Sequence, residues 1–118
     1  MLDRSTRLRS SRQFQQTVRR GVRVARPSLV LHGVRKGETP SQVGFVVSKA
    51  VGGAVVRNRV KRQLRALVRP LVAEVPVGLD VVVRALPSAA GGGAQLGDDL
   101  GGAWVTLMQR LEVGGGHV

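Results

Sequence analysis

The hydrophobic period of the chain changes once between residues 42 and 73, and this change most constrains the fold. In QVGFVVS, residues 42–48, apolar side chains alternate with other residues, which is typical of a strand. The glycine-bearing loop KAVGGA, residues 49–54, separates this strand from a helix that the apolar spacing predicts over Val55–Ala73. Pro70 predicts a kink in this helix or an early end. The expected buried stripe is Val56, Val60, Leu64, Leu67 and Leu71.

A shorter helix and two strands are predicted before this strand, namely Ser10–Arg20, Val22–Ala25 and Leu29–Val34. The helix is indicated by Ser10 and Gln13, which have the spacing of a capping box, and by Gly21, which is placed to end it. Residues 35–41, RKGETPS, are predicted to form a turn-rich connection.

The nearly continuous apolar run Leu79–Leu86 predicts a last strand that is covered on both faces. A flexible loop over residues 87–97, a helix over Asp98–Leu111 and a frayed tail over residues 113–118 follow in the prediction. Asp98 and Asp99 suit the positive N-terminal end of that helix better than a metal site. The expected inner face of the helix is Leu100, Trp104, Leu107 and Leu111.

The predicted order is αβββαβα, so we expect a single α+β domain over residues 1–118. A chain of this length can bury a core without disulfides or metal, and it has no cysteine. No apolar run is long enough to cross a bilayer, and the first residues lack the apolar stretch of a signal peptide. We therefore expect a soluble, cytoplasmic protein with no membrane partner.

Positive charge is concentrated in the first 69 residues. The net charge of +12 comes from 19 basic and 7 acidic residues. Residues 1–69 hold 17 of the basic residues and two of the acids, a balance of +15, whereas residues 70–118 have a balance of −3. A biased base composition explains why arginine replaces lysine, but it does not explain why acids vanish from one half. The distribution favours a polyanionic partner, above all nucleic acid.

Six cations lie within thirteen residues of the predicted long helix: Arg57, Arg59, Lys61, Arg62, Arg65 and Arg69. Most of them fall away from the apolar stripe, so the helix is expected to bury one side and present a cationic ridge on the other. For Arg69, simple solvation and contact with RNA are equally open interpretations.

The sequence contains no catalytic constellation. Its two histidines, His32 and His117, lie in a predicted strand and in the glycine-rich tail, which is unsuited to a paired-histidine ribonuclease mechanism. There is no cysteine nucleophile, no tyrosine and no HxxxH metal spacing. We therefore predict a binding protein with no catalytic residues of its own and no small-molecule substrate.

Residues 44–65 resemble the signature of the bacterial ribonuclease P protein family, G-x-x-V-S-K-K-x-G-x-A-V-x-R-N-R-x-K-R-x-x-R, with its spacing kept throughout. The matching residues are Gly44, Val47, Ser48, Lys49, Gly52, Ala54, Val55, Arg57, Asn58, Arg59, Lys61, Arg62 and Arg65. The opening RLRSSRQFQQTVRRG and the strand LDVVVRA also resemble family segments, so the likeness covers roughly residues 4–112.

The resemblance implies a fold and a division of labour. The family fold is αβββαβα with a left-handed βαβ crossover through the basic helix, a ribosomal-protein-S5-domain-2-like arrangement, against the usual preference of about 98% for right-handed crossovers. The protein is then the accessory subunit of an endoribonuclease in which a catalytic RNA hydrolyses precursor tRNA and releases its 5′ leader. The implied partners are that RNA and precursor tRNA, and Mg²⁺ is expected to be held mainly by the RNA.

Two sets of site residues follow from the resemblance. The expected contacts with the catalytic RNA and its phosphates are Lys49, Arg57, Asn58, Arg59, Lys61, Arg62, Arg65 and Arg69. The expected leader cleft, between the first helix and the sheet, uses Phe14, Val18, His32 and Lys49. Phe14 could equally pack in the core, and strand alternation leaves the face of His32 open.

The chain departs from the family pattern at four positions. The family often has a second aromatic residue where Val18 stands and a tyrosine where His32 stands. Its second lysine is Ala50 here, and the usual asparagine is Gly53. Histidine can still stack on a base, whereas valine can only pack, so the grip on the leader is expected to rely less on aromatics and lysine.

Two other functions remain open from the sequence. A ribosomal or general RNA-binding domain of similar fold would bind structured RNA without promoting leader removal. An autonomous nuclease would cleave without an RNA partner. The R-N-R-x-K-R spacing after the V-S-K-x-x-G loop favours the ribonuclease P subunit over the first, and the missing acid–base set disfavours the second.

Overall fold

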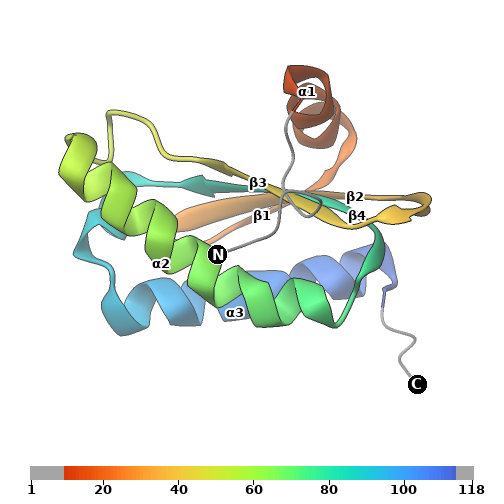
Figure 1. Ribbon diagram of the computed structural model, residues 1–118. Coiled ribbons are helices and arrows are strands. Elements are labelled where there is room, and N and C mark those ends of the chain that lie inside the picture. Colours follow the sequence, from red (N-terminus) through yellow and green to blue (C-terminus); the bar gives the residue numbers. More distant parts are fainter. Residues whose placement is uncertain (1–9, 114–118) are drawn as a thin grey trace.

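The computed structural model describes residues 10–113, and Figure 1 shows its helices and strands. The elements are α1 (Ser11–Arg20), β1 (Val22–Ala25), β2 (Leu29–Pro40), β3 (Gln42–Val46), α2 (Ala54–Ala73), β4 (Val77–Ala85), the 3-10 helix η2 (Pro87–Gly91) and α3 (Gly93–Leu111). The predicted α+β class and the predicted order of helices and strands are confirmed. Of the predicted frayed tail, residues 114–118 lie outside the described residues, and Val113 packs against the core.

The four strands form one mixed sheet in the order β1-β2-β4-β3. The pairs β1–β2 and β2–β4 are antiparallel, whereas β3 and β4 are parallel. α2 therefore joins two adjacent parallel strands, as the expected βαβ unit does, and the left hand of this crossover stays a prediction. Within residues 10–113, no helix is long and apolar enough to cross a membrane.

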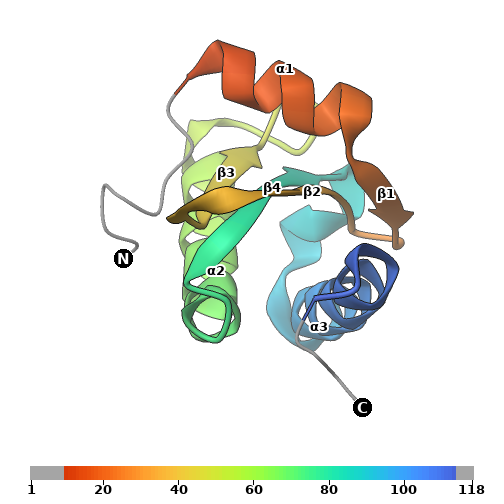
Figure 2. The same ribbon diagram turned by 90° about the vertical axis from the view of Figure 1, so that its right-hand side faces the viewer.

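The helices cover the two faces of the sheet differently. Figure 2 shows α1 lying across one face, with α2 and α3 against the other. Two glycines identify the faces, because a Cβ atom at Gly33 would collide with Leu107 of α3, and one at Gly44 would collide with the ring of Phe14 in α1. Since side chains alternate along a strand, the sheet has a core face, toward α2 and α3, and an α1 face.

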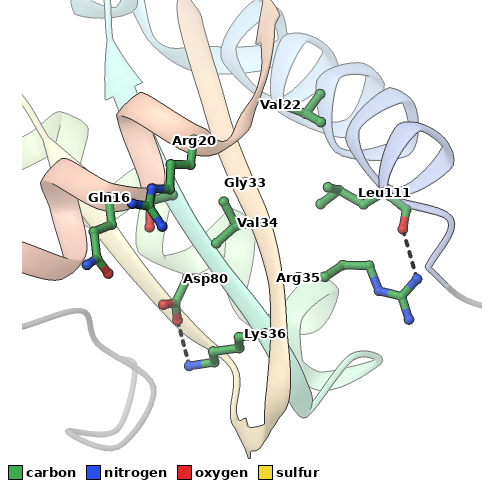
Figure 3. A pocket seen from close by; sticks show the side chains of 10 residues that line it. Gln16, Arg20, Val22, Gly33, Val34, Arg35, Lys36, Asp80 and Leu111 are labelled. Carbon is green, nitrogen blue, oxygen red and sulfur yellow. Dashed lines mark hydrogen bonds and ion pairs between the residues drawn. The ribbon is translucent and has the colours of Figure 1, made fainter.

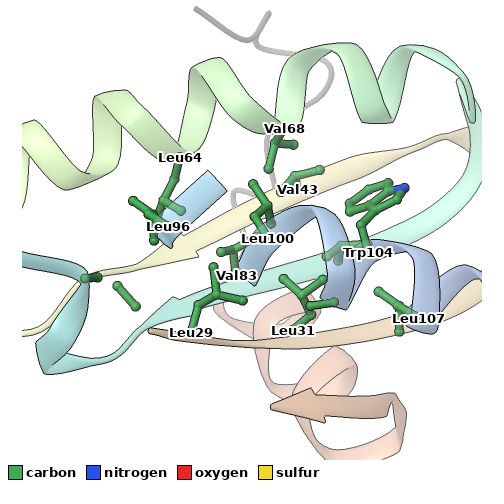
Figure 4. Close-up of a cluster of buried hydrophobic side chains, with 14 of the residues drawn as sticks. Leu29, Leu31, Val43, Leu64, Val68, Val83, Leu96, Leu100, Trp104 and Leu107 are labelled. Carbon is green, nitrogen blue, oxygen red and sulfur yellow. The ribbon is translucent and has the colours of Figure 1, made fainter. Parts of the chain in front are cut away.

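The hydrophobic core lies between the core face and the two long helices (Figure 4). The buried residues of α2 are Val60, Leu64, Val68 and Val72. Val56, Leu67 and Leu71, which the sequence placed on the buried stripe, are only partly buried. The expected inner face of α3 is confirmed at Leu100, Trp104 and Leu107, and Leu111 is partly buried.

α1 begins and ends as the sequence predicts. Ser10 Oγ accepts hydrogen bonds from the backbone N–H groups of Arg12 at 3.1 Å and Gln13 at 3.4 Å. The side chain of Gln13 accepts one from the N–H of Ser10 at 3.4 Å, which completes the capping box. The N–H of Gly21 donates to the carbonyl of Thr17 at 2.9 Å and closes the last turn.

β2 is longer and β3 is shorter than the sequence suggests. The predicted turn over residues 35–41 is wrong, because β2 continues to Pro40 and pairs with β4 at Arg35–Leu79 and, beyond a register shift, at Pro40–Val77. Pairing with β4 overrides the local turn preference, and the irregular register accommodates the turn-forming residues. β3 ends at Val46 rather than at residue 48.

Two further breaking signals in the sequence do not break the structure. Pro70 does not end α2, which continues to Ala73, since Pro70 lies on the exposed side of the helix, where its missing N–H leaves no buried carbonyl unpaired. The predicted flexible loop over residues 87–97 is also wrong, because it forms η2 and the start of α3. Gly92, with φ of 58°, makes the turn between them.

Asp98 and Asp99 do not cap α3, because the helix begins earlier than predicted, at Gly93. The Asp99 carboxylate instead accepts hydrogen bonds from the N–H of Ser28 at 3.0 Å and from its hydroxyl at 2.6 Å. These bonds, led by the one from the hydroxyl, hold the pKa of Asp99 below its ordinary value. Asp99 therefore fastens α3 to the turn between β1 and β2.

Candidate nucleic-acid interface

The predicted RNA-contact residues of α2 project from three sides of the helix. Its outward side carries Asn58, Arg62 and Arg69, all of which are exposed. The side next to β3 is identified by Arg65, whose guanidinium carbon lies 5.9 Å from the centre of the Phe45 ring. The half-buried residues that share this side are Arg57, Lys61 and Arg65. The cationic ridge is therefore wider than the sequence suggests.

Arg59 occupies the third side of α2 and has a partner within the protein. Its Nη2 donates a hydrogen bond to the carbonyl of Ala90 in η2 at 2.9 Å. This bond braces η2 against α2. Arg59 consequently has fewer free donors for RNA than Arg62, although the sequence places both in one motif.

No carboxylate neutralises the cations of α2 in the part of the chain that the structure describes. The ion pair found there joins Lys36 Nζ to Asp80 Oδ1 at 2.6 Å, between β2 and β4. The Nε atoms of Arg57 and Arg65 are buried without a hydrogen-bond partner. The N-cap of α2 is Gly53, so no side chain caps its first N–H groups, and its first turn contains no acid. Unpaired guanidinium and N–H donors at a helix start suit phosphate oxygens.

The predicted leader-cleft residues of α1 and β2 lie on the same side of the sheet, the α1 face. The ring of Phe14 covers Gly44 of β3, and Gly44 is joined through Val82 of β4 to His32 of β2 in one cross-strand row. His32 therefore faces α1 and not the core, which answers the question that alternation left open. Phe14 and Val18 are half-buried, so each packs on the protein and keeps part of its surface accessible.

Lys49 lies apart from this row. It is exposed in the turn that connects β3 to α2, beside the start of the basic helix. Ala50 lies in the same turn, where its N–H donates to Ser48 Oγ at 3.3 Å, and Gly53 is the N-cap of α2. The four departures from the family pattern thus divide between the α1 face, with Val18 and His32, and the start of α2.

Two arginines on the α1 face were missed by sequence reasoning. Arg23 is directly opposite His32 in the β1–β2 pair, and Arg84 is opposite Val30 in the β2–β4 pair. Both side chains are exposed. Strand alternation predicts that Arg84 and Val82 share one face of the sheet. It does not predict the register that places Arg23 and Arg84 beside His32. The α1 face therefore carries more positive charge than α1 and β2 alone predict.

His32 is enclosed by these surroundings. It is 6% exposed, and its Nδ1 has no hydrogen-bond partner. Burial lowers the pKa of the imidazole below its ordinary value, and the charges of Arg84 and Arg23 lower it further. These surroundings therefore favour the neutral form of the imidazole in the free protein.

A pocket is lined by residues of α1, β2 and β4 and by Leu111 at the end of α3 (Figure 3). Gln16 and Arg20 of α1 and the Lys36–Asp80 ion pair contribute to its lining. Asp80 lies within β4 and forms the ion pair with Lys36 of β2. Among residues 10–113, no three His, Asp or Glu side chains are grouped so that they could hold a metal ion.

Comparison with known sequences identifies the family. The model of the family Ribonuclease P matches residues 2–108. The ribonuclease P protein component of Streptomyces avermitilis is 52% identical over 127 residues, which cover 98% of this chain and 98% of that protein. The component from Streptomyces griseus is 51% identical with the same coverage.

Solved structures agree with the sequence comparison. The RNase P protein of Staphylococcus aureus matches with a TM-score of 0.78 and 25% identity, covering 87% of this chain and 95% of that chain. The RNase P protein of Thermotoga maritima shares the fold, with a TM-score of 0.71 at 24% identity over 92% of this chain and 98% of that chain. The chain therefore belongs to the ribonuclease P protein family, the protein components of an endoribonuclease complex in tRNA processing.

Proposed function

We propose that the protein binds the catalytic RNA of ribonuclease P through α2 and holds the 5′ leader of precursor tRNA on the α1 face. Hydrolysis is assigned to the RNA, and the protein is assigned no catalytic residue. The observation that carries this proposal is the set of α2 cations without acidic partners among the described residues, together with the α1 face of the sheet, where His32 and the ring of Phe14 from α1 lie.

The cations of α2 would act on RNA phosphates. Arg57, Lys61, Arg62 and Arg65 offer donors that no carboxylate occupies in the described chain, and arginine presents a planar fork that matches phosphate oxygens. Each such contact releases counterions from the RNA, so binding should weaken steeply as salt rises. Lys49, Asn58 and Arg69 are exposed on the same helix or at its start and extend this surface.

The leader would be held by stacking and charge. It is single-stranded and varied in sequence, so recognition cannot depend on base edges. The accessible part of Phe14 offers a stacking surface, and His32 lies in the same cross-strand row. Val18 adds apolar contact one turn farther along α1.

The protein would assist the reaction by lowering phosphate repulsion. Cations between the leader and the catalytic RNA reduce the cost of bringing two polyanions together. Mg²⁺, held mainly by the RNA, supplies the metal-ion chemistry of hydrolysis. The partners proposed are the catalytic RNA and precursor tRNA in the cytoplasm, with no small-molecule substrate.

Reconstitution tests this proposal. Precursor tRNA is incubated at low, near-cellular Mg²⁺ with a bacterial ribonuclease P RNA, with the protein, with both, or with neither. The proposal predicts cleavage at the mature 5′ end only when both are present. Tight RNA binding without stimulation would favour a general RNA-binding domain. Cleavage by the protein alone would show that it is a nuclease in its own right.

A further inference from the structure

We propose that Arg23, His32 and Arg84 form a phosphate-binding site on the α1 face, and that the imidazole of His32 takes up a proton when an RNA phosphate occupies the site. The inference rests on the proposed binding of the leader to this face, and it goes beyond it by naming the residues and the linked proton.

The strand register brings the three side chains together. Arg23 is directly opposite His32, and Arg84 is diagonal to it, two residues beyond its partner Val82. Directly opposite Cβ atoms in an antiparallel pair lie about 5 Å apart and diagonal ones about 7–8 Å. Two guanidinium groups on long side chains can therefore converge above one imidazole.

Both guanidinium groups are available to a ligand. Arg23 and Arg84 are exposed, and neither forms an ion pair with a carboxylate in residues 10–113. The hydrogen bond from Arg110 Nη1 to Arg23, at 3.1 Å, is accepted by the backbone carbonyl of Arg23 and does not involve its guanidinium. Two unpaired arginines on neighbouring strands are the kind of donor set that recognises a phosphate.

The state of the His32 side chain is a second, independent observation that points to a ligand at this position. More than nine-tenths of the residue is buried, yet its Nδ1 has no hydrogen-bond partner. A buried polar atom left unpaired is costly unless a ligand or a proton changes its state. The imidazole lies on the strand between those of the two arginines, in the same cross-strand row as Gly44, which the Phe14 ring covers.

The charges around His32 explain why a proton should accompany the phosphate. On the α1 face of the sheet, the ionisable groups near it are Arg23, Arg84, and the Lys36–Asp80 pair farther along β2 and β4. The helix packed above contributes Arg12, Arg19 and Arg20 and no acid. Burial and positive neighbours hold the pKa of His32 below its ordinary value of about 6.5.

A bound phosphate reverses the effect of the positive neighbours on the pKa of His32. Its negative charge neutralises Arg23 and Arg84 and attracts the imidazolium, so the pKa of His32 rises on binding. A group that is more basic in the complex takes up a proton as the complex forms, and affinity therefore increases as pH falls through the interval between the two pKa values. Each unit of difference corresponds to a tenfold change in affinity at the low-pH limit.

The direct test follows the two imidazoles of the protein by NMR between pH 5.5 and 8. His32 and His117 are the only histidines in the chain, and the spectrum of His32→Gln assigns them. A short oligouridylate serves as the probe, because uracil and the phosphodiester do not titrate in this interval. We expect the midpoint of His32 to rise by about one unit when RNA is added, which is within the range that a nearby charge produces. An unchanged midpoint with RNA bound overturns the proposal.

Affinity measurements separate this inference from the proposed function. The full chain is assembled with the catalytic RNA, and the affinity for leader-bearing precursor tRNA, relative to leaderless tRNA, is measured at pH 7.5 and pH 5.5. We expect a several-fold gain at low pH in the wild type, and none in His32→Gln.

Arginine variants complete the test. Arg84→Gln or Arg23→Gln should weaken leader binding about 3–10-fold, as expected for one charge-assisted phosphate contact. Arg35→Gln is the matched control, since it removes the same charge from the opposite face of β2. An equal loss of leader affinity in Arg35→Gln would overturn the proposed phosphate-binding site. Leader binding that survives all these changes would leave the proposed function intact, whereas no preference for the leader in the wild type would refute that function.

Discussion

The two faces of the sheet are built from the same strands but carry opposite kinds of chemistry. In β4, Val81 and Val83 point to the core face and are fully enclosed by α2 and α3. The alternating residues Asp80, Val82 and Arg84 point to the α1 face, which a single ten-residue helix crosses. The core face provides stability, and the α1 face leaves donors and an unpaired imidazole for a ligand. Substitutions on the two faces should therefore affect different measurements.

The largest effect is expected for Leu31→Ala on the core face. Leu31 is 0% exposed, and removing a buried leucine side chain typically lowers the free energy of unfolding by about 2–5 kcal/mol. Val34→Ala is the control in the same strand, because Val34 is half-buried on the α1 face and should cost less than about 1 kcal/mol. Urea unfolding of both variants measures the difference. Similar losses would mean that the α1 face carries as much stability as the core.

A smaller loss of stability is expected for Asp99→Asn, with a defined pH dependence. The folded-state pKa of Asp99 lies below its ordinary value of about 3.9, so its carboxylate stabilises the fold fully above about pH 4. This contribution is lost as pH falls through the folded pKa. Unfolding midpoints of variant and wild type should thus differ at pH 7 and converge below pH 4. Asp98→Asn, at the exposed neighbouring position, should leave the unfolding midpoint at pH 7 nearly unchanged.

On the α1 face, Phe14→Ala should impair leader binding more than folding. Loss of one base–aromatic stack costs about 1–3 kcal/mol of binding, so the affinity for leader-bearing precursor tRNA should fall roughly 5–150-fold. Leaderless tRNA should bind nearly as before. Gly44→Ala provides a second variant, because its added Cβ would displace the Phe14 ring without removing it. Equal losses with and without leader would assign Phe14 to packing alone.

The smallest effect is expected from single cations of α2. Arg62→Ala should reduce the slope of log affinity against log salt for the catalytic RNA by about 1, the value for one phosphate contact. Arg59→Ala should change the slope less, since Arg59 already donates to Ala90. Arg35→Ala controls for net charge. A slope that is the same for Arg62→Ala and the control would remove Arg62 from the phosphate contacts.

Sequence patterns within a single segment predicted the helices and strands that do not depend on competition with distant contacts. The Ser10–Gln13 capping box placed the start of α1, and the apolar run over residues 79–86 correctly indicated a strand covered on both faces. Signals that compete with distant contacts failed. Gly37 and Pro40 suggested a turn, but pairing with β4 extends β2 through them. The glycine run at 91–93 suggested a flexible loop, but η2 and α3 are held there by Arg59 and Asp99.

The candidate site was predictable only where it lies on one element. The cations of α2 were readable from a single helix. The sequence did not predict which face of the sheet His32 lies on, because that depends on the close contact between Gly33 and Leu107 of α3. Arg23 and Arg84 join His32 only through the register of three strands, which no local pattern specifies.

Mapping the contact surface of RNA on the protein tests the central claim most directly. Backbone amide shifts are recorded while a single-stranded RNA of leader length is added to the full chain. We expect the shifts to change at Arg23, Gly44 and Arg84, and at the start of α2, with little change at Val105 on the exposed side of α3. Changes centred on α3, with the α1 face unaffected, would contradict the assignment of RNA binding to that face.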